Sequence, residues 1–306
     1  MNGKNKVAIL MATYNGEEYI DEQIESILLQ EFKDYDLIIR DDGSTDSTFD
    51  ILKKYALKSK NIFIMQNNSK EHGQLANFSF LFDYAKEKNY EYIMFSDQDD
   101  IWLPNKVSLS LKTINQFGRK PILLYTNYLI LDQYKRTKKT AFNMHFKENF
   151  ESIFVQNWIM GCTMMLNKEM IKQVEHIPLG VDNHDYWIAL VASLLEKSII
   201  YVDVPTMIHR LHNNNVTTRS SNSNIFSKAE RLYTILFNSN FRKQKMNVWT
   251  MVEQKLAHSY TSNHICNLAN MLQHKGIYSV ALSLKYRYKG MNYLSSLSFY
   301  TMLLLH

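Results

Sequence analysis

The sequence contains little cysteine. Cys162 and Cys266 are its two cysteines among 306 residues, and they lie far apart. A structural zinc site needs closely spaced ligands, and a disulfide-stabilised fold needs several cysteine pairs. Neither class of protein fits this sequence, whereas a reducing compartment does.

Glycine-rich phosphate-binding loops are also missing. The chain has nine glycines, but no Gly-x-Gly-x-x-Gly follows the first apolar segment, and no Gly-x-x-x-x-Gly-Lys-Ser/Thr occurs. No Lys or Arg lies between Val7 and Phe32. We therefore expect neither the usual dinucleotide cradle nor a basic loop around a triphosphate. A diphosphate held through a metal ion fits better.

Long apolar segments are absent at both ends. Lys4 and Lys6 precede only about seven apolar-leaning residues, so we expect no signal peptide and a cytoplasmic location. Residues 293–305 are rich in apolar side chains. Their length is well below the roughly 20 residues that a membrane-crossing helix needs.

Acidic residues are scarce in the last part of the chain. Residues 1–222 hold 25 Lys and Arg against 28 Asp and Glu, a net charge of −3, whereas residues 223–306 hold 10 against 2, a net charge of +8. A near-neutral body with a basic, aromatic tail favours an anionic membrane surface as partner. Nucleic acid is not expected, because no recognised binding module accompanies the basic residues. The alternative is a helical cap packed on the fold or on a second subunit, as in a homodimer.

Apolar and amphipathic segments alternate over the first 132 residues. Strands are predicted at 7–11, 37–39, 62–65, 92–95 and 122–131, with helices starting near residues 20, 49, 75 and 104. This alternation predicts an α/β fold with a mostly parallel sheet and helices on both faces. Residues 133–222 are expected to complete the domain, with a strand over 157–166, a helix near 184 and a strand over 199–204. Residues 223–306 are expected to form an α-helical C-terminal region.

Three polar segments follow predicted strands: Thr13-Tyr14-Asn15, Asp41-Asp42-Gly43-Ser44 and Asp97-Gln98-Asp99-Asp100. Ligands of parallel sheets bind beyond the carboxyl ends of the strands, so we expect these segments to meet. Carboxylates at alternate positions suit a hard divalent ion such as Mn²⁺ or Mg²⁺. The alternatives are a solvated acidic turn for the last segment and a turn with a helix cap for the second. Gly161 indicates a close approach of the backbone to another group of backbone atoms.

Four motifs occur in a recognisable order: Val7–Gly16, Asp41–Asp46, Ser96–Pro104 and His184–Trp187. Together they resemble glycosyltransferase family 2, the inverting GT-A type. Within that family the sequence looks most like bacterial rhamnosyltransferase-like enzymes of cell-surface polysaccharide assembly. The resemblance covers about residues 5–218. It is highly specific for the family and much less so for the sugar.

The resemblance implies roles for the matching residues. The nucleotide-sugar pocket would be lined by Thr13, Tyr14, Asn15, Asp41, Asp42, Gln74, Asn77 and Asp97. Mn²⁺ or Mg²⁺ would be held by Asp97, Asp99 and His212. Asp185 would be the general base, and the acceptor side would comprise Gly161, His184 and Trp187. The sequence departs from the family pattern at His209, where the family usually has Tyr, and the role of this residue is open.

The implied reaction is the metal-dependent, inverting transfer of a sugar from a nucleoside-diphosphate donor to a hydroxyl of a lipid-linked glycan. L-rhamnose from dTDP-rhamnose is the first candidate, and a UDP-hexose is the next. The acceptor would be a polyprenyl-diphosphate-linked saccharide, which places a peripheral enzyme on the inner face of the cell membrane. A nucleotidyltransferase and a non-catalytic nucleotide-sugar-binding scaffold are the alternatives. The missing basic loop speaks against the first, and the acidic residues Asp97, Asp99 and Asp185 speak against the second.

Overall fold

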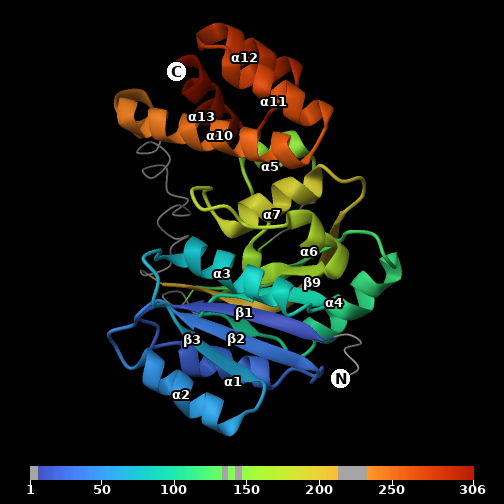
Figure 1. Ribbon diagram of the computed structural model, residues 1–306. Coiled ribbons are helices and arrows are strands. Elements are labelled where there is room, and N and C mark those ends of the chain that lie inside the picture. Colours follow the sequence, from blue (N-terminus) through green and yellow to red (C-terminus); the bar gives the residue numbers. More distant parts are fainter. Residues whose placement is uncertain (1–5, 133–136, 142–146, 213–232) are drawn as a thin grey trace.

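A single β-sheet lies at the centre of the computed structural model, which describes residues 6–132, 137–141, 147–212 and 233–306 (Figure 1). Four parallel strands form its first half: β1 (Val7–Thr13), β2 (Tyr35–Asp41), β3 (Ile62–Gln66) and β4 (Tyr92–Ser96). They lie in the order β3-β2-β1-β4. The apolar runs of β1 and β2 are buried on both faces, which is why they are continuous rather than alternating.

The second half of the sheet mixes strand directions. It contains β5 (Ile101–Trp102), β6 (Leu123–Asp132), β7 (Thr137–Thr140), β8 (Met164–Asn167) and β9 (Ile199–Leu211). From β4 the order continues β8-β6-β9-β5, and β7 pairs with β6. The strands β8, β5 and β7 are antiparallel to their neighbours, and β6 and β9 are parallel. Most of the described strands thus run in one direction, as predicted.

Helices cover both faces of the sheet. One face carries α1 (Ile20–Leu28), α2 (Thr48–Lys58), α4 (Lys106–Ile114) and the 3-10 helix η1 (Asn115–Phe117). The other carries α3 (Gln74–Glu87), α5 (Phe150–Val155), α6 (Lys168–Val174) and α7 (His184–Ser193). Alternate residues of β1 contact the two apolar clusters: Ile9 joins the α1 side and Leu10 the α3 side. The predicted α/β architecture is confirmed.

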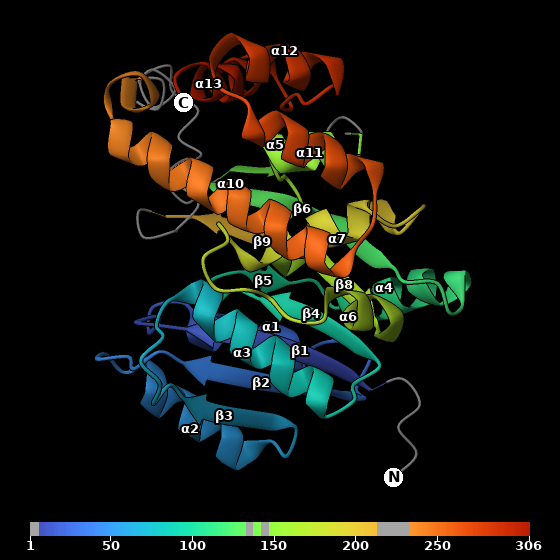
Figure 2. The same ribbon diagram turned by 45° about the horizontal axis from the view of Figure 1, so that its top comes forward.

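The C-terminal region is helical throughout its described part. It contains α10 (Ser239–Ser259), α11 (Asn263–Gln273), α12 (Gly276–Lys285) and α13 (Tyr293–Leu304). These helices gather above α5 and α7, and Figure 2 shows α10 crossing this side of the molecule. Trp249 of α10 and Phe299 of α13 pack on Phe154 of α5, with ring centroids 5.6 and 6.4 Å away. No helix in the described parts of the chain combines the length and apolarity needed to cross a membrane.

The prediction of one strand over 157–166 was wrong for most of its length. The chain is irregular up to Met160, forms the 3-10 helix η2 (Gly161–Thr163), and only then enters β8. The helices α5 and α6 and the two-residue β5 were not predicted, because elements this short show no full hydrophobic period. The expected division between residues 222 and 223 lies outside the described residues.

Candidate active site

The three polar segments predicted to meet do meet, at the carboxyl ends of β1, β2 and β4. In the sheet register Thr13 lies opposite Asp41, and Met11 lies opposite Ser96. The loops that follow these strands therefore leave the sheet side by side. The chain connectivity of the parallel strands produces this edge, as expected for a fold of this class.

Asp41 fixes the loop after β2. Its carboxylate accepts hydrogen bonds from the hydroxyls of Thr13 (3.0 Å) and Ser44 (2.6 Å) and from the backbone N–H groups of Gly43 and Ser44. The side chain is completely buried. In this conformation no surface of Asp41 is open to a ligand, so its predicted contact with a nucleoside stays a prediction. The geometry suits a residue that shapes the loop.

Asp42 points away from Asp41 towards the loop before α3. It accepts hydrogen bonds from the Asn67 side chain (2.6 Å), the Gly73 backbone N–H (2.7 Å) and His72. Burial by itself would raise the pKa of Asp42, but hydrogen bonds from Asn67, Gly73, Asn77 and His72 outweigh it and lower the pKa. Asp42 is therefore ionised at neutral pH. Asn67 was missed by the sequence reasoning, since nothing local marks it.

The loop after β1 is tied to the acidic loop by Gln98. The Tyr14 backbone N–H donates to Gln98 Oε1 (2.9 Å), and Gln98 Nε2 donates to the Tyr14 carbonyl (3.1 Å). The Tyr14 side chain itself is 54 % exposed. Gly16 lies close to Gln98, and a Cβ atom at Gly16 would lie 2.5 Å from Gln98 Oε1, so the Gln98 side chain would have to move. Asn15 accepts from the Thr45 backbone N–H and so joins the same loops.

The start of α3 reaches the acidic loop. Gln74 Nε2 donates to Asp97 Oδ1 at 3.0 Å, so the predicted proximity of these two residues is observed. Asn77 lies one turn further on, is buried, and donates to the Gly73 carbonyl. Asn77 thus braces the loop that holds Asp42.

The acidic loop concentrates charge in a buried place. Burial and the neighbouring carboxylates of Asp100 and Asp99 raise the pKa of Asp97 well above its ordinary value. Asp100 is completely buried: its Oδ1 pairs with His209 Nδ1 at 2.7 Å, and its Oδ2 has no hydrogen-bond partner among the residues that the structure describes. Burial would lower the pKa of His209, but the Asp100 carboxylate outweighs it and raises that pKa. His209, left open at the sequence level, is therefore the partner of Asp100.

Among the residues that the structure describes, two groupings of ligand-type side chains occur at this loop. Asp99 contacts His212, with 2.9 Å between Oδ2 and Nε2. Separately, ligand-type atoms of Asp97, Asp100 and Cys162 all lie within 4.8 Å of one another. The predicted trio of Asp97, Asp99 and His212 is thus divided between the two groupings in this conformation.

Asp185 lies in the first turn of α7. Its Oδ2 accepts from the Gly161 backbone N–H (3.2 Å) and its Oδ1 from Asn157 Nδ2 (3.3 Å). Burial raises its pKa from 3.8 to about 6, although these hydrogen bonds oppose the shift. The charge of Asp185 also contributes to the raised pKa of Asp97, so the two carboxylates lie within electrostatic range. A carboxylate with a pKa near 6 is well matched to accept a proton near neutral pH.

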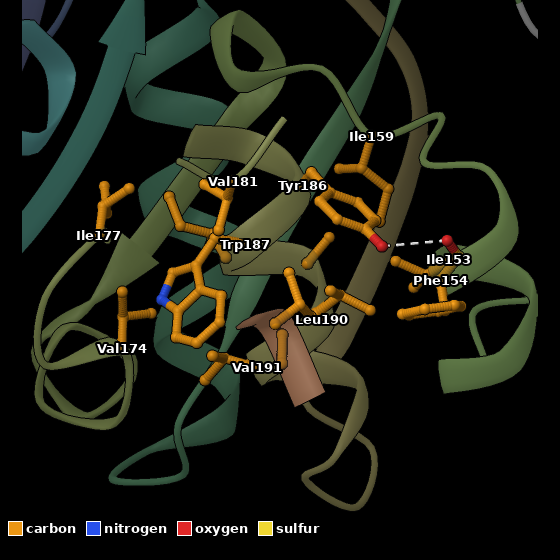
Figure 3. Packing of buried hydrophobic residues seen from close by; sticks show 14 of the residues in the cluster. Ile153, Phe154, Ile159, Val174, Ile177, Val181, Tyr186, Trp187, Leu190 and Val191 are labelled. Carbon is orange, nitrogen blue, oxygen red and sulfur yellow. Dashed lines mark hydrogen bonds between the residues drawn. The ribbon is translucent and has the colours of Figure 1, made fainter. Parts of the chain in front are cut away.

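His184 and Trp187, predicted on the acceptor side, are both buried. The His184 ring packs on Phe78 and Phe95, with centroids 4.1 and 4.9 Å away, and burial lowers its pKa to about 3. Trp187 packs in the apolar cluster beside Val181, whereas Tyr186 turns towards Phe154 (Figure 3). Core packing accounts for His184 and Trp187 here, and their contact with an acceptor stays a prediction.

Gly161 makes a close approach, as its position in the sequence suggested, although to the His184 side chain and not to the backbone. A Cβ atom at Gly161 would lie 2.2 Å from His184 Nε2. The absence of a side chain lets η2 approach α7, which brings the Gly161 N–H to Asp185. Gly161 therefore positions the carboxylate, whatever else it contacts.

Comparison with known proteins assigns the chain. The family model described as "Glycosyl transferase family 2" matches residues 8–174, more than half of the chain. The chain belongs to glycosyltransferase family 2. It is accordingly a glycosyltransferase, and the resemblance read from the four motifs is confirmed.

Curated family 2 relatives cover much of this chain. The dTDP-rhamnosyl transferase RfbG of Shigella flexneri is 29% identical over 278 residues, which cover 85% of this chain and 92% of the relative. WfaP of Escherichia coli, a UDP-Glc:α-D-GlcNAc-diphosphoundecaprenol β-1,3-glucosyltransferase, is 31% identical over 193 residues, which cover 63% of this chain and 71% of the relative.

A solved structure supports the GT-A fold of this family 2 glycosyltransferase. TarS residues 1–349 of S. aureus in complex with UDP-GlcNAc matches with a TM-score of 0.58 and 16% identity, covering 92% of this chain and 88% of that one. At this identity the likeness shows the fold alone.

The donor groups at the acidic loop of this glycosyltransferase suit a hard divalent cation. Within the described parts of the chain, the buried Oδ2 of Asp100 makes no hydrogen bond that a cation would have to displace. Burial and nearby carboxylates raise the pKa of the Cys162 thiol far above its ordinary value, so the sulfur stays protonated and is a poor ligand. The carboxylates of Asp97, Asp99 and Asp100 are then the groups that could hold Mn²⁺ or Mg²⁺.

Proposed function

We propose that this enzyme transfers a sugar, with inversion, from a nucleoside diphosphate to a hydroxyl of a lipid-linked glycan in bacterial polysaccharide synthesis. The observation that carries the proposal is Asp185, a carboxylate with a raised pKa held beside the acidic loop by Gly161 and Asn157. Family membership favours this transfer over the nucleotidyltransferase and scaffold alternatives.

In this proposal the loops at the sheet edge bind the donor. Thr13, Tyr14 and Asn15 line the nucleotide pocket, Asp42 accepts hydrogen bonds from the nucleoside, and Asp41 shapes the loop between them. The carboxylates of Asp97, Asp99 and Asp100 would hold the divalent ion, with His212 as neighbour of Asp99. When bound, the ion would supply positive charge beside the departing diphosphate.

Asp185 acts on the other substrate. Its carboxylate takes the proton of the acceptor hydroxyl while that oxygen attacks the anomeric carbon from the face opposite the diphosphate. One displacement inverts the anomeric configuration and needs no covalent nucleophile. The Gly161 N–H and Asn157 orient the carboxylate, and neutral, buried His184 supports the helix end that carries it.

L-rhamnose from dTDP-rhamnose is our first candidate for the donor. RfbG, a dTDP-rhamnosyl transferase, aligns over 92% of its own length. The likeness to WfaP makes a UDP-hexose the second candidate. The acceptor in the name of that enzyme, GlcNAc-diphosphoundecaprenol, supports a saccharide on a polyprenyl diphosphate as the acceptor here.

A thermal-shift panel tests the donor and the ion together. The protein is heated with dTDP-rhamnose, UDP-glucose, UDP-galactose, UDP-N-acetylglucosamine or GDP-mannose, each with Mn²⁺ and with EDTA. Binding to the folded state raises its stability by RT ln(1 + [L]/Kd). We expect a shift with dTDP-rhamnose that EDTA abolishes. A shift with a UDP-hexose alone would select the second candidate, and no shift with any donor would refute the proposal.

We further propose that the C-terminal helices rest on an anionic membrane surface. Ile277 and Tyr293 are each 79 % exposed, and Lys285, Arg287 and Lys289 are exposed near them in the chain. Apolar side chains that enter the interface and basic ones that meet anionic headgroups act together in such contacts. A peripheral position would place the enzyme beside a lipid-linked acceptor.

Vesicle sedimentation tests this contact. We expect the protein to sediment with vesicles containing phosphatidylglycerol and not with pure phosphatidylcholine vesicles, and the variant Ile277→Asp to remain in solution. Leu57→Asp is the matched control, because Leu57 is 89 % exposed on α2. Sedimentation that is equal for both variants would refute the contact. A homodimer seen by analytical ultracentrifugation, which Ile277→Asp dissociates, would assign the surface to a second subunit.

A further inference from the structure

A cavity of about 290 Å³ lies between the catalytic body and the C-terminal helices. The body supplies residues 154–160 and the start of α7, including Asp185, while α10 supplies Phe241, Lys245 and Trp249. The helix α13 supplies Ser295, Ser298, Phe299 and Met302. The cavity thus has the carboxylate of Asp185 in its wall, although most of that wall belongs to elements outside the sheet.

The walls are amphipathic in a way that suits a saccharide. Phe154, Trp249 and Phe299 present apolar ring surface. Hydrogen-bond donors and acceptors line the same cavity, on the carboxylate of Asp182 and the amides of Gln156, Asn157 and Asn183. A purely hydrocarbon chain would desolvate these groups without replacing their hydrogen bonds, so a polyprenyl tail is a poor occupant. The cavity volume of about 290 Å³ is just below the roughly 300–1,000 Å³ typical of small-molecule sites, so the cavity suits a small polar ligand such as a sugar.

The position of Asp185 separates this cavity from the donor edge. The acidic loop lies at the carboxyl end of β4, and the charge of Asp185 contributes to the raised pKa of Asp97 in that loop. The same Asp185 side chain lines the cavity. A hydroxyl held in the cavity would therefore lie beside the base, while the donor occupies the sheet edge.

Lys245 supplies positive charge to the cavity wall. Its Nζ pairs with the carboxylate of Asp182 in the loop before α7, and it lies 5.8 Å from the centroid of the Trp249 ring. The pair joins α10 to the catalytic body at the cavity. A lysine here can meet the anionic diphosphate that carries the acceptor saccharide.

We propose that this cavity binds the saccharide of a diphosphate-linked acceptor, and that Lys245 of α10 and the cavity-facing side of α13 determine which acceptor is used. The proposal rests on the proposed transfer reaction and adds its second substrate site. The C-terminal helices are then part of the acceptor site as well as a cap on the core.

Two variants and two matched controls test the assignment. Lys245→Ala removes the charge, and Ser298→Phe fills the cavity. Lys243→Ala changes an exposed lysine of the same helix α10, and Thr301→Phe enlarges a residue of α13 that does not line the cavity. The probes are undecyl diphosphates that carry N-acetylglucosamine, N-acetylgalactosamine, glucose or galactose, used with the donor that the thermal-shift panel selects.

We expect the two cavity variants to raise the acceptor KM by at least about tenfold, the scale of one lost contact to a charged group. Their donor-induced thermal shift and their slow hydrolysis of donor in the absence of acceptor should stay within about twofold of wild type, as should every property of the controls. These donor readouts also show whether each variant is folded. If Ser298→Phe does not fold, Lys245→Ala still tests the proposal.

The proposal fails if the cavity variants keep the wild-type KM, or if they change it no more than the controls do. It also fails if the wild-type enzyme hydrolyses the donor yet transfers sugar to none of the four acceptors. An enzyme that neither binds nor hydrolyses any donor would refute the proposed function instead, so the two failures are distinguishable.

Discussion

The variant Asp185→Asn tests the proposed chemistry and the electrostatics of the site together. An amide cannot accept the proton of the acceptor hydroxyl, and general-base catalysis contributes roughly 100- to 10,000-fold to such reactions. We therefore expect kcat to fall by about that factor while the donor-induced thermal shift is unchanged. The wild-type kcat/KM should fall as the pH is lowered through about 6, the pKa to which burial raises Asp185.

The same variant should be more stable than the wild type at neutral pH. The pKa of Asp185 rises from 3.8 to about 6 on folding. At 1.36 kcal/mol per unit, ionised Asp185 costs the folded state on the order of 3 kcal/mol. The amide of the Asp185→Asn variant avoids this cost. Its NH₂ group faces the Asn157 Nδ2 donor, however, so one hydrogen bond is lost, which lowers the stability by about 1 kcal/mol. A net gain of about 1–2 kcal/mol is expected at pH 7.

The pH dependence of that gain has a definite sign. Above pH 6 both states of the wild type are ionised and the cost is fully present, whereas below 3.8 both are protonated and it vanishes. The stability difference between variant and wild type should therefore shrink as the pH falls from 6 towards 3.8. Urea denaturation at several pH values measures it, and Glu169→Gln, in the first turn of α6, is the control.

Two results would refute this reasoning. If Asp185→Asn keeps more than a tenth of the wild-type kcat, Asp185 is not the base. If the variant is inactive but less stable than wild type at pH 7, the carboxylate is a structural group and its burial carries no electrostatic cost.

Replacing Gly161 by Ala puts a methyl group 2.2 Å from His184 Nε2. We therefore expect the free energy of unfolding, measured by urea denaturation, to fall by roughly 1–3 kcal/mol. A variant as stable as wild type would contradict this close packing. Burial lowers the pKa of His184 to about 3, so between pH 6.5 and 3 only the unfolded state takes up a proton at this residue. The free energy of unfolding should therefore fall as the pH drops from 6.5 towards 3, and His184→Phe should remove this dependence. An unchanged pH profile in the variant would contradict the prediction. Asp99→Ala or EDTA should abolish both the donor-induced shift and transfer, with exposed Asp50→Ala as control; transfer that persists in EDTA would exclude an essential ion.

The sequence was sufficient for the sheet's first half and for the location of the site. Continuous apolar runs mark β1, β2 and β4 because those strands are buried on both faces, and amphipathic segments of more than two turns mark the helices between them. Parallel connectivity then places the polar loops at one edge. This consequence of topology needs no knowledge of side-chain contacts.

Adjacent acidic residues show what the sequence could not decide. Asp41 turns inward to Thr13 and is buried, while Asp42 turns to Asn67 and Gly73. Asp41 and Asp42 are neighbours in the sequence and carry the same local signal, although their roles differ. Their environments depend on groups from other loops, so only the folded chain distinguishes them.

The second half of the site was decided by contacts between distant segments. His209 pairs with Asp100, which lies 109 positions away in the sequence. His184 is buried against Phe78 and Phe95, and Trp187 is buried in the apolar cluster. The cavity beside Asp185 needs residues 154–160 and residues 241–302 at once. Hydrophobic periodicity is a local property of the chain, and it determines which segments become helices and strands. Which of their polar residues stay at the surface, are paired or line a cavity is settled only when those segments pack together.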